Sequence, residues 1–267
     1  MVLKYISNRG IEADLNCYPY RALPSDLLDY EWDVVSDNRR INSFVKTFVE
    51  KKINIDIFAT TKSALENANI LTDIFEADIL DGKPGRLFVN EQYLQCYICG
   101  SVKKSNWKTI IQQCEYKLIT DNPFWISESM YALEKSEIES KDNKKYKNKY
   151  KYRYASGQKE RYIINDHFVE CPFLLRFYGP CVNPSVTIDG VEHSVNAILS
   201  EGEYIEIDSR TETVVKVLSD GKKENLFHYR NNDIFKKIGT GKVSVVWNNQ
   251  FNIDIVLYKE RSEPRWI

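Results

Sequence analysis

Hydrophobic and polar residues alternate along much of this chain, as half-buried β-strands require. In the segment 45–58, Ile53, Ile55 and Ile57 are separated by polar residues, which predicts a strand with one face turned inward. The segments 87–89, 92–98 and 109–119 continue the strand pattern. Within 109–119 the residues expected to share one face are Ile110, Gln112, Cys114, Tyr116 and Leu118.

One segment of the first half has the helical period instead. Ser63 and Glu66 have the spacing of a capping box, in which the hydroxyl and the carboxylate satisfy backbone donors reciprocally. The apolar residues that follow recur at intervals of three and four, which predicts an amphipathic helix that ends in the turn-rich stretch 81–85. The opening of the chain, through Pro19 and Pro24, is expected to be irregular and rich in turns.

The second half contains short strands separated by turns. Asp189-Gly190 and Asp220-Gly221 are strong hairpin signals. Around them, six or more strands at roughly ten-residue spacing predict a β-sandwich of about 100 residues, with at most one short helical turn near 231–237. The strand segments are 162–164, 174–178, 185–188, 203–210, a valine-rich run that ends at 218, 225–227, 243–247 and 251–257. The fold class expected from both halves is mainly β with one helix (α+β).

A change in composition separates the two halves. Residues 131–158 are poor in aliphatic side chains and dense in charge, with lysine and tyrosine interleaved at 141–154. We therefore expect three parts: an N-terminal domain at 1–130, a charged linker or arm at 131–158 and a C-terminal β-sandwich at 159–267.

Composition and charge narrow the class of protein. A hydrophobic content of 43% is enough for packed cores, and a net charge of −1 gives no global attraction to nucleic acid or anionic membranes. No signal peptide and no membrane span are predicted, because no apolar stretch approaches the required length. The expected compartment is the cytoplasm, unless lysis or a dedicated machine exports the protein.

The cysteines do not form a recognisable metal or redox motif. Cys96 and Cys99 resemble half of a zinc site, but residues three apart on a strand point to opposite faces, and no second ligand pair follows. We expect both to be buried strand residues. His167 precedes Cys171 by four residues, yet no third orienting group accompanies this pair, so a Cys–His nucleophile is not favoured.

Other candidate chemistry has simpler explanations. Acid pairs such as Glu201 with Glu203, or Asp208 with Glu212, would suit a glycosidase, but with 38 acidic residues in the chain such pairs are inevitable. Gly239-Thr-Gly241 lacks the following lysine and helix of a phosphate loop and is interpreted as a turn. No catalytic, metal-binding or cofactor-binding residue is predicted, no cofactor is expected, and the chain is not expected to be an enzyme.

The basic, tyrosine-interleaved segment is the one local feature with a functional pattern. Its cations could follow a polyanion by charge while the tyrosines stack, although a solubilising arm or a strand that docks on a neighbouring subunit is equally compatible. The candidate contacts to an anionic surface are Lys144, Lys145, Lys147, Lys149, Lys151 and Arg153. No sequence-specific binding of nucleic acid is expected.

The order of the predicted pieces resembles the distal tail proteins of siphophage-type tails and related tail-like particles. The first-half pieces are Leu23-Pro24, the strand 52–57, the single helix followed by Asp81-Gly82, and the closing sequence 122–125. In the second half they are 186–190, 205–208, 214–217, 225–227, 239–243 and the last alternating strand into Tyr258. The resemblance covers nearly the whole chain; the lysine–tyrosine segment 141–154 is not a motif of that family.

The resemblance implies a structural role in the virion tail, assembled in the host cytoplasm. N-terminal domains of this family form a hexameric ring that joins the tail tube to the baseplate or tip. Their C-terminal domains, galectin-like β-sandwiches, hold receptor-binding or side-fibre proteins. The expected partners are therefore further copies of the chain, the tail tube protein, a tail-tip or tail-associated protein, and receptor-binding or side-fibre proteins.

Two other classes compete with this interpretation. A carbohydrate-binding β-sandwich would present several aromatic residues on one face and would contact cell-wall glycans of the host. The sequence alone does not place Tyr204, Phe227, Tyr229 and Trp247 on such a face. A polysaccharide hydrolase carried on a tail comes third.

Overall fold

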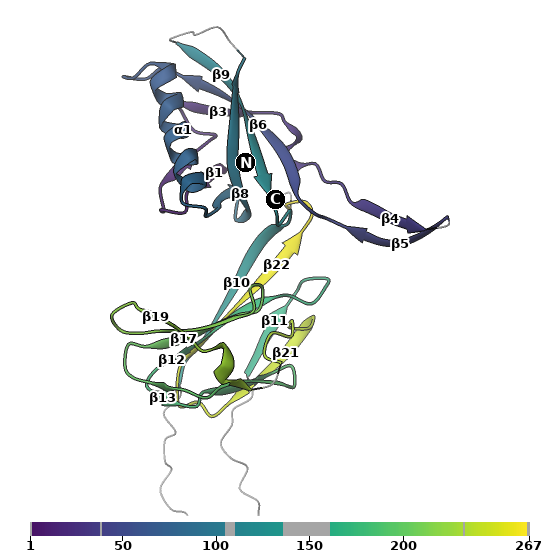
Figure 1. Ribbon diagram of the computed structural model, residues 1–267, viewed down its shortest axis with the longest axis vertical. Helices are drawn as coiled ribbons and strands as arrows, with labels where there is room; N and C mark the ends of the chain where they lie inside the picture. Colours follow the sequence, from purple (N-terminus) through teal and green to yellow (C-terminus); the bar gives the residue numbers. More distant parts are fainter. Residues whose placement is uncertain (1, 38, 105–109, 136–160, 232, 266–267) are drawn as a thin grey trace, which may run out of the picture. The chain divides into compact units, whose positions relative to one another are not determined.

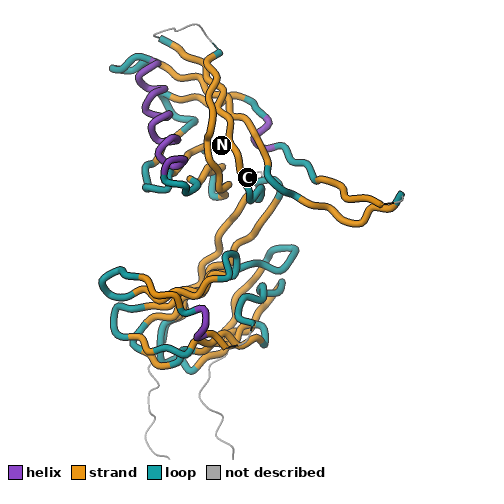
Figure 2. The backbone as a smooth tube through the Cα atoms, viewed as in Figure 1, coloured by secondary structure: helices purple, strands orange, loops and turns teal. Residues whose placement is uncertain are grey.

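The structure is a computed structural model that describes residues 2–37, 39–104, 110–135, 161–231 and 233–265. It divides into two compact units: residues 1–127 with 260–267 form the first, and residues 128–259 form the second. Strands dominate both units, and α1 (Ala64–Leu80) is the single α-helix within the described ranges (Figures 1 and 2). The expected fold class, mainly β with one helix, is confirmed.

The first unit is a network of antiparallel strands around β8. One branch runs in the order β8-β7-β1-β2, and the other in the order β8-β9-β6-β3. The strands β4 and β5 pair only with each other. The bounds are β1 (Leu3–Ile6), β2 (Glu12–Asp14), β3 (Tyr20–Leu23), β4 (Asp33–Asp37), β5 (Arg40–Val45), β6 (Val49–Phe58), β7 (Gly85–Val89), β8 (Gln92–Lys103) and β9 (Ile111–Thr120), with the short 3₁₀ helix η1 (Asp26–Leu28) between β3 and β4.

The helix α1 begins and packs as its sequence predicts. The Ser63 side chain accepts from the Glu66 N–H, and the Glu66 carboxylate accepts from the Ser63 N–H at 2.7 Å, so the capping box is complete. The buried face of α1 packs on β6, β8 and β9. There the Phe75 ring makes edge-to-face contacts with Tyr5 and Tyr116 at 5.0 and 5.3 Å.

The second unit is a sandwich of two antiparallel sheets. One sheet has the order β19-β18-β17-β12-β22-β10, and the other has the order β11-β21-β14-β15-β20. The bounds are β10 (Trp125–Leu133), β11 (Arg161–Asn165), β12 (Phe173–Tyr178), β14 (Ser185–Ile188), β15 (Val191–Val195), β17 (Tyr204–Asp208), β18 (Thr213–Val217), β19 (Lys223–Asn225), β20 (Arg230–Asn231), β21 (Gly241–Trp247) and β22 (Ile253–Arg261). A small additional sheet pairs β13 (Cys181–Val182) with β16 (Ile198–Leu199), and the short 3₁₀ helix η2 (Phe227–Tyr229) precedes β20.

The inward faces of both sheets form one apolar core. Phe173, Leu175 and Phe177 of β12 are fully buried with Val243 and Val245 of β21 in the same cluster. Both predicted hairpin turns are confirmed: Ile188 pairs with Val191 around Asp189-Gly190, and Val217 pairs with Lys223 around Asp220-Gly221. At Asp189 and Gly190 φ is +51° and +75°, the left-handed conformation that such a turn requires.

Two sequence-based expectations about the first unit are wrong. The opening through Pro24 is rich in turns, as expected, but it is not irregular, since β1, β2 and β3 lie within it. Ile110 does not share the buried face of β9, because it precedes the strand and is 72% exposed, whereas Gln112, Cys114 and Tyr116 are buried. The first strand pairs with β7, through residues 80 to 86 positions apart in the chain, a partner that no local pattern reveals.

The chain enters the second unit along β10 and leaves it along β22. The residues after this return belong to the first unit, where Gln92 and Arg265 exchange two hydrogen bonds of 3.1 and 3.4 Å. The treatment of 1–130 and 159–267 as separate domains stays a prediction.

Candidate assembly surfaces

The most exposed secondary structure of the first unit is the hairpin of β4 and β5, residues 33–45. From here on, the arm means this hairpin and not the charged segment 131–158. It extends to the right of the first unit in Figure 1, and every described residue in its strands is exposed. Five large apolar side chains are among them: Val34, Val35, Ile41, Phe44 and Val45, at 36–62% exposure.

The apolar residues of the arm lie on both of its faces. Val34 and Phe44 stand opposite each other on one face, whereas Val45 is paired with Asp33 on the other. An isolated two-stranded hairpin is marginally stable. Because this hairpin carries apolar side chains on both faces, neither face is suited to contact with water alone. The arm therefore has the character of a strand pair that another surface covers.

The base of the arm is held by a lysine among aromatic rings. The Lys46 ammonium lies 5.3 Å from the Trp32 ring centroid and 5.4 Å from those of Tyr30 and Phe124. It also donates to the Pro123 carbonyl at 3.4 Å. Burial, and then the nearby charge of Lys51, lowers the pKa of Lys46 below the usual range. These contacts join the residues on both sides of the arm to the loop before β10.

A shallow cavity of about 360 Å³ opens beside this base. Lys51 closes one side of it by donating to the backbone carbonyls of Asp26 and Asp29, and burial lowers the pKa of this lysine. Five of its eleven lining residues are acidic, two are lysines, and the lining also includes Tyr30, Phe48 and Pro123. The surface beside the base of the arm is therefore polar, and the hydrogen bonds of Lys51 hold it in place.

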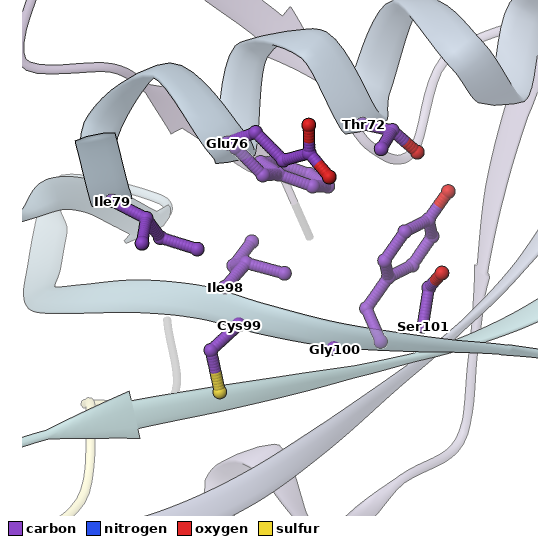
Figure 3. A pocket seen from close by; sticks show the side chains of 9 residues that line it. Thr72, Glu76, Ile79, Ile98, Cys99, Gly100 and Ser101 are labelled. Carbon is purple, nitrogen blue, oxygen red and sulfur yellow. The ribbon is translucent and has the colours of Figure 1, made fainter.

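A second cavity, of about 110 Å³, lies between α1 and β8 (Figure 3). Its lining residues are Thr72, Phe75, Glu76, Ile79, Ile98, Cys99, Gly100, Ser101 and Tyr116. The strand β8 is bulged here, because the pairing with β9 shifts between Ile98 and Gly100. Ile98 is buried beneath the helix, whereas the thiol of Cys99 points to the other side of the strand (Figure 3).

On the second unit the clearest exposed apolar pair belongs to the small sheet of β13 and β16. Val182 and Ile198 are direct partners there, at 66% and 67% exposure. Tyr229 and Trp247, two of the four aromatic residues weighed for a carbohydrate-binding face, do not share an exposed surface. Trp247 is 1% exposed within the core, where its Nε1 donates to the Phe251 carbonyl, while Tyr229 is 56% exposed.

The candidate anionic-surface contacts Lys144, Lys145, Lys147, Lys149, Lys151 and Arg153 all lie outside the described residues. The structure therefore leaves that hypothesis a prediction.

The remaining sequence candidates fall into structural roles. Cys96 is buried and Cys99 exposed, on opposite faces of β8 as the spacing predicts, but the expectation that both are buried is wrong because Cys99 lies on the face of the strand turned away from α1 (Figure 3). The Cys171 thiol donates to Asn165 Oδ1 at 3.3 Å. Gly239-Thr-Gly241 leads directly into β21, and Gly241 has φ +86°, so the interpretation as a turn is confirmed.

One member of each acid pair named from the sequence, Glu203 and Asp208, forms a local ion pair. Glu203 lies 3.0 Å from the Lys216 ammonium and accepts from the Ser200 N–H, and these contacts, the backbone one first, lower the pKa of Glu203. Asp208 pairs with Arg210 at 3.0 Å. Within the described ranges no three or more His, Cys, Asp and Glu side chains gather into a group that could hold a metal, and no helix there is both long and apolar enough to cross a bilayer.

Comparison with known proteins shows likeness in structure and not in sequence. No protein-family model matches the chain, and no curated protein sequence matches it. A chain of the phage P2 baseplate in its activated conformation with Ca is similar over 99% of this chain and 100% of its own length, with a TM-score of 0.60 and 14% identity. The phage p2 baseplate with Sr gives the same score and identity over 98% and 99%.

The SPP1 Dit (gp 19.1) protein, called a paradigm of hub adsorption apparatus in Gram-positive infecting phages, is also similar. The likeness covers 98% of this chain and 100% of that protein, with a TM-score of 0.53 and 9% identity. The resemblance predicted from the order of strands and turns is thereby confirmed in three dimensions: the chain has the fold of phage baseplate and hub proteins.

Proposed function

We propose that this protein is a structural hub at the distal end of a phage or phage-like tail. The observation that carries the proposal is the extent of the structural likeness, which includes both units of the chain and the whole length of the SPP1 hub protein. A likeness confined to one sandwich would fit many binding proteins, because sandwiches host unrelated functions. A match that extends through both units and includes the return of the chain along β22 fits far fewer classes of protein.

In this proposal the first unit forms a hexameric ring that joins the tail tube to the baseplate or tip. The arm supports the ring, because its apolar side chains need a covering surface. A ring of identical subunits is built from head-to-tail contacts, in which one surface of each copy meets a different surface of the next. An arm that extends from one side of the unit is suited to such a contact.

The second unit is the proposed attachment point for receptor-binding or side-fibre proteins. Its exposed pair of Val182 and Ile198 offers a small apolar contact away from the sandwich core. The tail tube protein and a tail-tip or tail-associated protein are the proposed partners of the ring. The resulting location is the virion tail, after assembly in the host cytoplasm.

The mass of the protein in solution tests the ring directly. Light scattering after size exclusion, with negative-stain images of the same peak, is expected to show six-fold rings, either of the protein alone or when tail tubes are added. Particles of another symmetry, or the absence of rings both alone and on tubes, would contradict the proposal.

Two double variants separate the roles of the units. Val34→Asp with Phe44→Asp places two carboxylates on directly opposed residues of the arm and is expected to abolish the ring. Val182→Asp with Ile198→Asp makes the same change on an equally exposed opposed pair of the second unit and should preserve the ring. A monomer whose second unit instead binds cell-wall glycans would favour the carbohydrate-binding alternative.

A further inference from the structure

The helix α1 presents an unusual surface to solvent. It contains no lysine, arginine or histidine, while Asp73 and Glu76 are exposed on it. Three large apolar side chains share this exposure: Ile70 at 36%, Ile79 at 40% and Leu80 at 84%. A helix face that combines acids with apolar residues is suited to a partner that is both basic and apolar.

The cavity between α1 and β8 lies under this face. Glu76 and Ile79 contribute to its helix side and Ile98 to its strand side, as Figure 3 shows. At about 110 Å³ it is too small for a drug-sized ligand and suits a single side chain. We call this cavity and the exposed residues of α1 the α1–β8 groove.

The tip of the arm has the complementary character. Arg39 and Arg40 are exposed there, and Ile41, the next residue of β5, is 62% exposed. The arm thus presents a basic group next to a branched aliphatic side chain. The α1–β8 groove presents an acid, Glu76, next to an aliphatic opening at Ile79.

The two surfaces are also placed as a ring requires. In Figure 1, α1 forms the left side of the first unit and the arm extends from the right. Complementary surfaces on opposite sides of one subunit generate a head-to-tail chain of copies that closes when the rotation between neighbours permits. The arm therefore faces away from its own groove and is free to reach that of the next copy.

We propose that the arm of each copy docks in the α1–β8 groove of a second copy of this chain. Ile41 fills the cavity beside Ile79 and Ile98, and Arg40 pairs with Glu76. This inference rests on the proposed ring and adds which surface of the neighbour receives the arm. The ion pair lies at the rim, so it selects the partner surface more than it adds affinity.

Charge reversal provides the first test, with ring formation followed by light scattering. Arg40→Glu and Glu76→Lys are each expected to lower the fraction of rings at least tenfold at low ionic strength. The combined R40E/E76K protein restores the pair in the reverse sense and is expected to recover most of that loss. Glu91→Lys, an exposed acid in the turn between β7 and β8, is the matched control and should leave the rings unchanged.

Cross-linking provides the second test and gives a positive signal. In a background with the exposed thiols replaced by Cys17→Ser and Cys99→Ser, I41C and I79C are combined and the protein is oxidised. We expect a ladder of covalent oligomers up to the hexamer. I41C with I70C is the control, because Ile70 is similarly exposed on the same helix but about 13 Å further along it.

The outcomes distinguish this inference from the proposed function. Rings that form without recovery in R40E/E76K, or that cross-link through I70C and not I79C, would overturn the docking site and leave the hub intact. If no variant and no wild-type sample forms rings, alone or on tail tubes, the hub proposal itself fails and the docking site with it. Recovery together with the I79C ladder supports both.

Discussion

The Lys46 ammonium lies over the Trp32 ring, at 5.3 Å from its centroid, and these two residues stand on either side of the arm. Trp32 directly precedes β4, and Lys46 directly follows β5. The contact therefore closes the arm at its base. Tyr30 and Phe124 extend the aromatic surroundings of the same ammonium. One cation and three rings thus surround the base of this exposed hairpin.

Replacement of Lys46 by methionine is expected to loosen the arm without unfolding the first unit. The aliphatic stem is preserved, but the cation–π contacts, worth roughly 1 kcal/mol each at partly exposed sites, are lost. Hydrogen exchange of the arm amides should then accelerate by at least about tenfold, because the loss of two such contacts already exceeds the 1.4 kcal/mol that corresponds to a factor of ten. Lys46→Arg keeps a cation over the rings and should exchange like wild type; equal acceleration in both variants would contradict the role of the charge.

Gly85 is expected to tolerate no side chain. A Cβ at this position, the first of β7, would overlap the Tyr5 hydroxyl and the Asp78 carboxylate, which are joined by a buried hydrogen bond of 2.6 Å. We expect Gly85→Ala to lower the free energy of unfolding in urea by roughly 1–3 kcal/mol. Gly100→Ala is the comparison, since its nearest contact would be an ordinary 3.5 Å to Lys117 Cβ. Equal stability of the two variants would contradict the packing argument.

The second unit is expected to lose stability in mild acid through His193. This ring is 1% exposed, its Nδ1–H donates to the Ile234 carbonyl at 2.9 Å, and burial lowers its pKa below 6.5. The unfolded chain then binds more protons than the folded chain once the pH falls below about 6.5, so stability decreases as the pH drops further.

Thermal unfolding between pH 7.5 and 5 measures this effect. The wild-type midpoint should fall with pH, and His193→Gln should flatten the slope. His228→Gln, at an exposed histidine, should keep the wild-type slope. A slope that survives in His193→Gln would assign the pH dependence to other groups.

The hypothesis of an anionic-surface contact at 141–154 has its own test. Changing Lys144, Lys145, Lys147 and Lys149 to glutamine should reduce retention on DNA or teichoic acid, most strongly at low salt, because fewer counterions are released. Retention at two salt concentrations measures this. Unchanged retention, or a flat salt dependence, would remove the hypothesis.

Features with a local cause could be predicted from the sequence. The capping box at Ser63 defines the start of α1 within a few residues, and the Asp-Gly pairs set two hairpins, because each signal acts between neighbours in the chain. The strand 52–57 follows from strict alternation. These local signals were enough to predict the fold class and, through their order, the resemblance to tail hub proteins.

The arm could not be predicted in this way. Its apolar residues occupy both faces and therefore lack a period of two, and its turn is formed around Arg39, with φ +70°, instead of a glycine. The signal that was available is the presence of five large apolar residues in 33–45 without a core-facing pattern. The α1–β8 groove could not be predicted from the sequence either, because it depends on a bulge at Cys99 and on the pairing of strands that are distant in sequence.

The return of the chain along β22 makes the second unit an insertion within the first. Residues 128–259 begin and end on β10 and β22, which are neighbours in one sheet, so the unit is a cassette with adjacent entry and exit points. Exchange of this cassette between proteins of the same fold needs two junctions, near 127 and 260, and preserves the contact of Gln92 with Arg265. Recombination at these two junctions would replace the whole second unit and leave the candidate assembly surfaces of the first unit unchanged.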